Sequence, residues 1–432
     1  MRNKLLCITP DFDAPFIVNI GQPLEVLKGQ GALSCSVVKE KDATIHDIFG
    51  HDAVLFFRTS TPALLKILYY AKLSGKPIIY GVDDNFFELA QSEIGALDPV
   101  RLRAHERFIM EADRVMVYSN PMMDRAGRLN KNTVKMVPGL DFSVLEGLEK
   151  QAGSEKTSIV YATWRNKRDI LSDLFVPAIK KILTEYSGRV EMHFWGYTPE
   201  EFKETPGVHF MPRTDYDTYI RRLYSSGFDI GLAPLKDDEF HRSKTNTKFR
   251  DYGACGIAGV YSNVDVYSDC VTDGETGLLV ENTAEGWYEG IERLIEDREL
   301  RASIKANAFE YVREHYDIKR VAADLFRIIG DALNNKKPAI LCAPPNSFYD
   351  IKTPKFPMAE DIFYREVLIN DPRPYRLSLR LMRMKVKPFK DVISLYFFKK
   401  TGLKNLEITF RKKILKTIKE RSEKVFRFPS VR

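Results

Sequence analysis

The sequence has few cysteines and no long apolar run free of charges. Its five cysteines are scattered and form no CxxC pair: Cys7, Cys35, Cys255, Cys270 and Cys342. An odd number of dispersed thiols argues against a disulfide scaffold, so we expect a reducing compartment. No stretch approaches the roughly 18 apolar residues of a membrane-spanning helix, and the apolar start is too short for a secretory signal. These absences predict a cytoplasmic protein that does not cross a membrane.

Histidines are also sparse, and the seven present show no spacing typical of metal ligands. The sequence contains no signature of an RRM, a KH domain or a zinc finger, which argues against a nucleic-acid partner. Hydrophobic residues make up 44% of the chain and charged residues 29%, as in globular proteins with a core. We therefore expect a globular protein with no metal, no other cofactor and no bound nucleic acid.

Positive charge is concentrated toward the C-terminal end. Residues 338–432 contain 22 Lys and Arg against nine Asp and Glu, so they carry +13, while residues 1–337 carry −6. An apolar helical stripe (Leu403, Leu406, Phe410, Ile414, Ile418) is flanked mostly by basic residues (Arg411, Lys412, Lys413, Lys416, Lys419). A basic amphipathic helix of this kind either lies peripherally on the anionic inner face of a membrane or packs its apolar side on the protein. The sequence leaves both alternatives open.

Short apolar runs alternate with helical patterns twice along the chain. The expected strands are residues 4–9, 34–38, 52–57, 75–84, 114–119 and 134–139, and then 156–164, 189–196, 228–234, 256–262 and 277–281. Strands alternating with helices predict parallel sheets covered on both faces. We therefore expect an α/β protein with two Rossmann-like, doubly wound domains, 1–150 and 151–337, facing a central cleft. A basic, partly helical extension, 338–432, would follow them.

The segment from 228 to 281 carries the strongest chemical signal. Lys244, Lys248 and Asp251 are spaced i, i+4 and i+7, so a helix places them on one face. Two ammonium groups beside a helix N-terminus suit a diphosphate, and Asp251 would accept hydrogen bonds from a ribose. The alternative is a solvated helix on which Asp251 pairs with Lys248.

This segment resembles the donor-binding region of retaining GT-B glycosyltransferases, that is, glycosyltransferase family four and its close relatives. The family pattern A-x-G-x-P-V-V-A-S followed by DGxTGLLV is matched by ACGIAGVYS, with Ala258 in place of proline, and by DGETGLLV. A sub-group with K-S-x-x-K-x-x-E-Y is closer still. The family's E-x7-E pattern is incomplete, because Ser243 stands where the first glutamate is expected. The likeness is specific here and diffuse over the rest of residues 1–335.

The resemblance implies sugar transfer, with retention, from a nucleoside diphosphate sugar to a glycan or lipid-linked acceptor in polysaccharide or cell-envelope biosynthesis. It places Arg165 on the donor phosphates, with Lys167 or Arg168 as substitutes, and Gly196 and Pro212 in two loops around the base. It adds the loop and helix residues Lys244, Asn246, Lys248, Asp251 and Tyr252 to the donor site. The positive charge of Arg165 and Lys248 would stabilise the leaving diphosphate catalytically, without a metal ion.

The acceptor is expected on the first domain, where Asp83 and Asp84 follow a predicted strand and Arg58 follows another. A carboxylate there would orient or deprotonate an acceptor hydroxyl, and orientation suffices where the leaving phosphate takes the proton. The alternative is that the aspartates cap the following helix. Two other functions also stay open from the sequence: a GT-B sugar epimerase, and a catalytically silent scaffold or membrane adaptor, which only Ser243 favours.

Overall fold

The computed structural model describes residues 3–89, 99–151, 155–163 and 175–339. The expected phosphate-binding residues Arg165, Lys167 and Arg168 and the basic extension lie outside these ranges. Within them, no helix is long and apolar enough to span a membrane.

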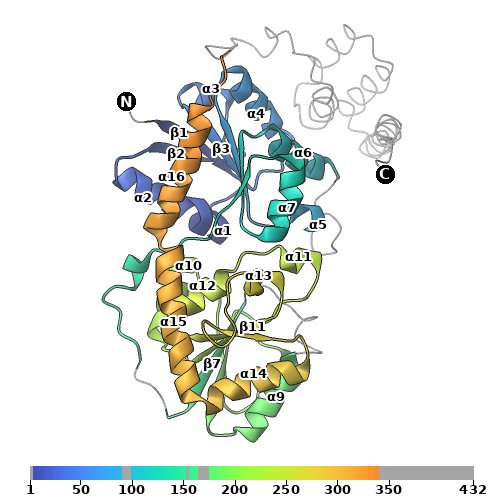
Figure 1. The fold of residues 1–432 in the computed structure, drawn as a ribbon, viewed down its shortest axis with the longest axis vertical. Helices are drawn as coiled ribbons and strands as arrows, with labels where there is room; N and C mark the ends of the chain where they lie inside the picture. Colours follow the sequence, from blue (N-terminus) through green and yellow to red (C-terminus); the bar gives the residue numbers. More distant parts are fainter. Residues whose placement is uncertain (1–2, 90–98, 152–154, 164–174, 340–432) are drawn as a thin grey trace, which may run out of the picture. The chain divides into compact units, whose positions relative to one another are not determined.

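The first domain contains a six-stranded parallel sheet in the order β2-β1-β3-β4-β5-β6. Figure 1 labels its strands β1, β2 and β3. Its strands are β1 Lys4–Thr9, β2 Ser34–Lys39, β3 Ala53–Phe57, β4 Ile78–Val82, β5 Arg114–Val117 and β6 Thr133–Lys135. Its helices are α1 Ala14–Phe16, η1 Ile17–Gly21, α2 Gln22–Gly29, α3 Ile45–Phe49, α4 Leu64–Leu73, α5 Phe86–Leu89, α6 Pro99–Glu111, α7 Asn120–Leu129 and η2 Phe142–Leu145. Strands β3 and β4 are buried along their whole length, as expected for a parallel sheet with helices on both faces.

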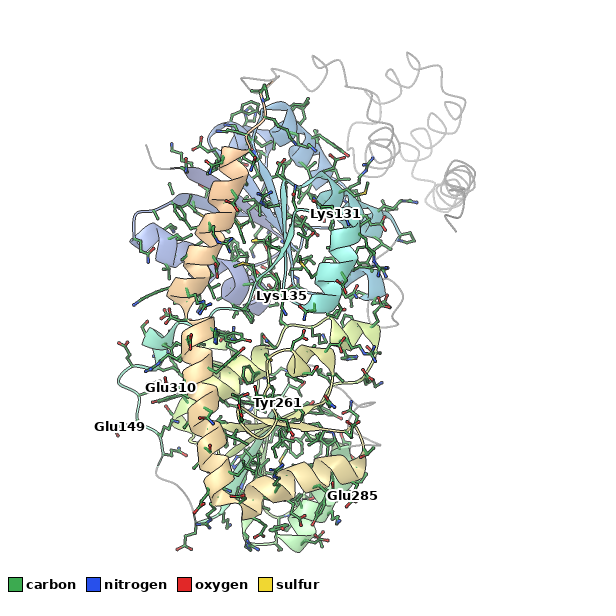
Figure 2. The ribbon with its side chains drawn as sticks, viewed as in Figure 1. Lys131, Lys135, Glu149, Tyr261, Glu285 and Glu310 are labelled. Atoms are coloured by element: carbon green, nitrogen blue, oxygen red, sulfur yellow. The ribbon has the colours of Figure 1, made fainter. Side chains whose placement is uncertain are left out.

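The second domain repeats this plan in the order β12-β11-β10-β7-β8-β9. Its strands are β7 Thr157–Ala162, β8 Val190–Trp195, β9 Val208–Met211, β10 Ile230–Ala233, β11 Ala258–Ser262 and β12 Leu278–Val280. Its helices are α9 Val176–Glu185, η4 Glu200–Phe202, α10 Tyr216–Ser225, α11 Glu239–Arg242, α12 Thr247–Ala254, α13 Asp265–Ser268, α14 Ala284–Glu296 and α15 Arg298–Tyr316. Tyr261 of β11 lies inside this domain (Figure 2), packed among residues of α12 and α15. The edge strand β9 is not among the strands expected from the sequence.

The chain crosses between the domains twice, and the two crossings touch. The Leu140 amide donates to the Tyr316 carbonyl (2.8 Å), and the Ile318 amide donates to the Leu140 carbonyl (2.9 Å). The second crossing leads into the last described helix, α16 Ile318–Asn334. Its apolar face packs with α2, β1 and β3 in the core of the first domain. The C-terminal helix of the expected 151–337 domain therefore belongs to the core of the other domain.

Arg250 of α12 connects this crossing to the second domain. Its guanidinium, buried to 1% exposure, donates to the Gly139 carbonyl (2.8 Å) and the Tyr216 hydroxyl (2.7 Å). It also forms an ion pair with Asp251 (2.6 Å). A buried guanidinium is stable only when its donors and its charge are satisfied, and here three different elements do so.

We predict that Arg250→Met lowers the free energy of unfolding by about 3–5 kcal/mol, because it leaves the buried Asp251 carboxylate without its partner. The double variant Arg250→Met, Asp251→Leu should recover part of this loss. Arg313→Met, which removes an exposed ion pair with Glu310, should cost less than about 1 kcal/mol. Guanidinium unfolding curves measure all three, and equal midpoints for Arg250→Met and Arg313→Met would contradict the assignment.

Candidate active site

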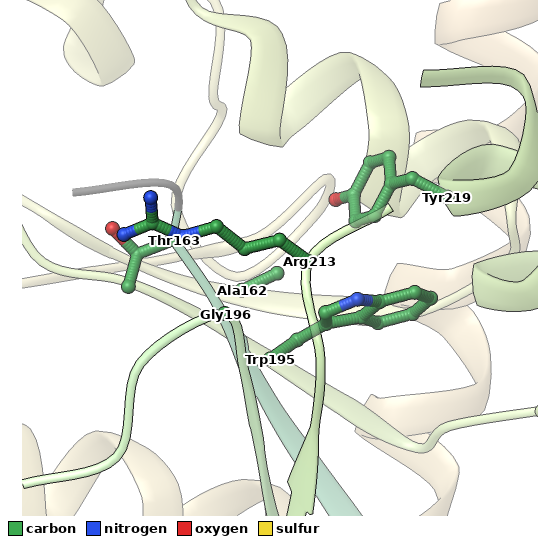
Figure 3. Close-up of a pocket in the computed structure, with 6 residues that line it drawn as sticks. All are labelled: Ala162, Thr163, Trp195, Gly196, Arg213 and Tyr219. Atoms are coloured by element: carbon green, nitrogen blue, oxygen red, sulfur yellow. The ribbon is translucent and has the colours of Figure 1, made fainter. Parts of the chain in front are cut away.

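A small pocket lies at the carboxyl ends of β7 and β8 in the second domain (Figure 3). Its lining residues are Ala162, Thr163, Trp195, Gly196, Arg213 and Tyr219. Doubly wound sheets bind their ligands at this edge, because the strand-to-helix loops diverge there. The pocket is therefore the candidate ligand site of this domain.

Gly196 allows the two strand ends to approach each other. Its φ is +90°, and a Cβ atom at this position would lie 2.1 Å from the Thr163 carbonyl oxygen. Only glycine fits such an approach at a positive φ. Beside it, the Trp195 indole donates to the Pro212 carbonyl (2.9 Å), which holds the loop after β9 against β8. The structure thus places the predicted residue Gly196 in the pocket lining and the predicted residue Pro212 against the lining residue Trp195.

Two cations lie at this pocket. Arg213 is exposed and lines it directly. Lys248 reaches its edge through Tyr219, whose hydroxyl accepts a hydrogen bond from the Lys248 ammonium (2.9 Å). Burial lowers the pKa of Lys248, against the attraction of Asp251. The sequence interpretation missed Arg213, although it named the neighbouring Pro212. An arginine just before the N-cap of α10, Asp215, was the available signal.

Asp251 and Tyr252 are placed differently from the expectation. The Asp251 carboxylate is buried and pairs with Arg250 rather than with Lys248, and it does not line the pocket. Its contact with a ribose therefore stays a prediction. Tyr252 is fully buried and donates its hydroxyl proton to the Leu232 carbonyl (3.0 Å). Tyr252 is therefore a core residue, and its contact with the donor, taken from the sub-group pattern, stays a prediction.

The loop before α12 contacts the first domain instead of lining the pocket. Ser243 is 1% exposed, and its hydroxyl accepts a hydrogen bond from the Asn85 amide (3.0 Å). The Lys244 ammonium lies 3.7 Å from an Asp84 carboxylate oxygen. Asn246, at the N-cap position of α12, donates to the Tyr316 hydroxyl (2.7 Å). Ser243 and Lys244 therefore join the two domains at the edge where each sheet's strands end, whereas Asn246 contacts α15 of its own domain.

Arg58 and the two aspartates form a charged cluster on the first domain. Among the described residues, Arg58 is the only non-glycine residue with a positive φ, +57°. Its guanidinium lies 3.4 Å from Asp83, 3.3 Å from Asp84 and 3.9 Å from Asp13. Backbone strain of this kind concentrates at functional sites, because the surrounding contacts must hold it in place. The structure therefore brings together all three predicted acceptor-side residues.

Asp83 is the most enclosed carboxylate of this cluster. One of its oxygens accepts a hydrogen bond from the Asn19 amide (3.0 Å). Burial raises the pKa of Asp83 to about 6, although the Arg58 charge opposes that shift. The helix α5 that follows is capped by Asn85, whose side chain accepts from the Glu88 amide (3.2 Å). Asn85, and neither Asp83 nor Asp84, therefore provides this capping hydrogen bond, which argues against the alternative that the aspartates cap the helix.

Comparison with known proteins finds one family that part of the chain resembles. No curated protein matches it in sequence. A model of the family described as glycosyl transferases group 1 matches residues 159–297, which contain the candidate pocket.

Solved structures share its fold at low identity. Anabaena HepE in complex with UDP and glucose aligns with a TM-score of 0.55 and 12% identity, over 76% of this chain and 100% of that chain. Sucrose-phosphate synthase from Thermosynechococcus elongatus aligns with a TM-score of 0.58 and 13% identity, over 78% of this chain and 100% of that chain. A glycosyltransferase from Rickettsia africae aligns with a TM-score of 0.56 and 12% identity, over 78% of this chain and 100% of that chain. These findings confirm the expected GT-B fold and support a glycosyltransferase, in which residues 159–297 are similar to the family glycosyl transferases group 1.

Proposed function

We propose that the chain transfers a sugar from a nucleoside diphosphate sugar, held in the pocket at β7 and β8, to an acceptor hydroxyl at Asp83. The observation that carries this proposal is the pocket itself, which places Arg213 and the Lys248–Tyr219 pair at the strand ends of a group 1 domain. The donor domain and the acceptor domain meet nearby, at the Lys244–Asp84 contact.

The donor chemistry follows from the charges. A leaving nucleoside diphosphate develops negative charge in the transition state, and fixed cations stabilise it most in a partly enclosed site. Arg213 offers a planar guanidinium to a phosphate, and Lys248 a buried ammonium. Arg165 or Lys167 would add to them. We take uridine diphosphate as the nucleotide, because HepE of similar fold was solved with UDP. No metal ion is required in this scheme.

The acceptor chemistry follows from the first domain. A carboxylate held by Arg58 and Asn19 orients a sugar hydroxyl for attack, and in a retaining reaction the leaving phosphate takes the proton. Retention rests on the resemblance to family four, through DGETGLLV. The acceptor we propose is a glycan or a lipid-linked sugar of polysaccharide or cell-envelope biosynthesis. The basic residues 338–432 support a lipid-linked acceptor, because they suit an anionic leaflet.

We predict that Arg213→Ala weakens UDP binding while the fold is kept. Loss of a charge-assisted phosphate contact costs about 1.5–3 kcal/mol, which is on the order of a tenfold to hundredfold rise in Kd. Arg313→Ala removes the same charge from an exposed site on α15 and should leave the Kd unchanged. Titration calorimetry with UDP measures both. If the two variants bind UDP equally well, Arg213 does not hold the donor.

Asp83 predicts a pH dependence of transfer. Its folded pKa is raised to about 6, so the carboxylate is ionised above that pH and becomes protonated as the pH falls through it. We expect kcat/KM to decline below about pH 6 for this reason. Asp83→Asn should lower kcat/KM and remove that decline, while Asp124→Asn, at an exposed position on α7, should keep it. A wild-type profile that is flat from pH 5 to pH 8 would exclude the role.

The basic extension predicts membrane binding. We expect the full-length chain to co-sediment with vesicles that contain an anionic lipid, and less so as salt is added. Replacing Arg411, Lys412, Lys413, Lys416 and Lys419 by Gln should release it, because each basic residue near the surface contributes about 1 kcal/mol. Neutral vesicles are the control. If the extension packs its apolar side on the protein instead, the wild type stays in the supernatant at low salt, and the variant with the five substitutions melts like wild type.

A further inference from the structure

Three potential metal ligands lie together on the edge of the second sheet. Glu191 and His193 belong to β8, and His209 belongs to the edge strand β9. The strand register places His193 directly opposite His209. Because side chains alternate along a strand, Glu191 lies on the same face as His193. Sequence spacing does not reveal this group, because 15 residues separate the two histidines along the chain.

The ligand atoms of these residues converge. One Glu191 oxygen lies 4.0 Å from Nε2 of His193 and 3.8 Å from Nε2 of His209. One ligand atom from each residue falls within 4.8 Å of the others. Ligands of a tetrahedral zinc ion lie about 3.3 Å apart, given Zn–N and Zn–O distances of roughly 2.0–2.2 Å. Side-chain rotations that move these atoms by about an ångström would complete such a site.

The surroundings leave the two imidazoles and one Glu191 oxygen available to a cation. The Lys156 ammonium donates to the other Glu191 oxygen (2.9 Å), which leaves the oxygen near the imidazoles oriented toward them. The two rings are nearly parallel, with centroids 4.7 Å apart. Neither imidazole has a hydrogen-bond partner among the described residues. The His209 side chain is 49% exposed, so an ion can enter and keep a water molecule as a further ligand.

We propose that Glu191, His193 and His209 bind one zinc ion, which clips β9 to β8. Two imidazole nitrogens and a carboxylate oxygen are a ligand set that Zn²⁺ prefers, and a water molecule completes the coordination. The site is separate from sugar transfer, which uses no metal in the scheme above. The zinc ion would still act on the pocket indirectly, by fixing the position of β9 against β8. Trp195 follows His193 by two residues on the same face of β8, and its indole donates to the Pro212 carbonyl in the loop after β9.

The test uses the full-length chain with any affinity tag removed, stripped with EDTA and then dialysed. Titration calorimetry with zinc chloride should show one site in the wild type, and thermal melting should shift upward on addition of zinc. His209→Gln and His193→Gln should each raise the zinc Kd at least tenfold and abolish the thermal shift. His46→Gln, which removes an exposed histidine of α3, should bind zinc like wild type.

Cobalt gives an independent readout, since Co²⁺ bound in place of zinc at a nitrogen-containing site has visible absorption bands that His209→Gln should lose. His209 is exposed, so this variant should melt like wild type without metal, and a loss of binding would not reflect unfolding. The proposal is overturned if wild type takes up no zinc. It is equally overturned if His209→Gln and His46→Gln bind zinc with the same affinity.

Discussion

The buried guanidinium of Arg250 is the group on which the arrangement of both domains depends. Asp251 balances its charge, while the Tyr216 hydroxyl and the Gly139 carbonyl accept its remaining donors. A buried guanidinium is stable only while its hydrogen-bond and ion-pair partners stay in position. An unpaired donor or an uncompensated charge is costly in a low-dielectric core. One side chain therefore fixes α12 relative to α10 and to the first crossing between the domains. The pocket residue Tyr219 lies on that same α10.

The fold could largely be predicted from the sequence, because buried parallel strands appear as short apolar runs. The expected runs at 52–57 and 228–234 contain β3 and β10, and the alternation with helices predicted both parallel sheets. The position of α16 could not be predicted. Its amphipathic pattern shows that one face is buried but not against which sheet, and that is decided by the Leu140–Ile318 contact. The edge strand β9 was missed because half-exposed residues show no continuous apolar run.

The candidate site was predictable only in part. Sequence spacing shows which residues share a helix face, but it does not show which other residues that face contacts. Lys248 reaches the pocket, whereas Asp251, on the same predicted face, turns to Arg250 in the core. Tyr252 was included through a family pattern; its ring packs against β10, where Gly231 leaves room for it, and its contact with the donor stays a prediction. Arg213 carried no spacing signal at all, since it comes to the pocket through the pairing of β9 with β8.

The charged cluster of Arg58, Asp83 and Asp84 on the first domain also has a contact with the second domain. Asp83 and Asp84 are adjacent carboxylates in a partly buried place, and their mutual repulsion helps to raise the pKa of Asp83. The positive charge of Arg58 opposes this rise in pKa. Arg58 itself has a left-handed backbone conformation, which costs on the order of 1–3 kcal/mol. Arg58 is shared among three carboxylates, because Asp13 lies 3.9 Å from it as well. Lys244 from the other domain lies 3.7 Å from Asp84 and adds a second positive charge to this cluster. The domain contact therefore brings a cation of the second domain to the acceptor-side carboxylates of the first.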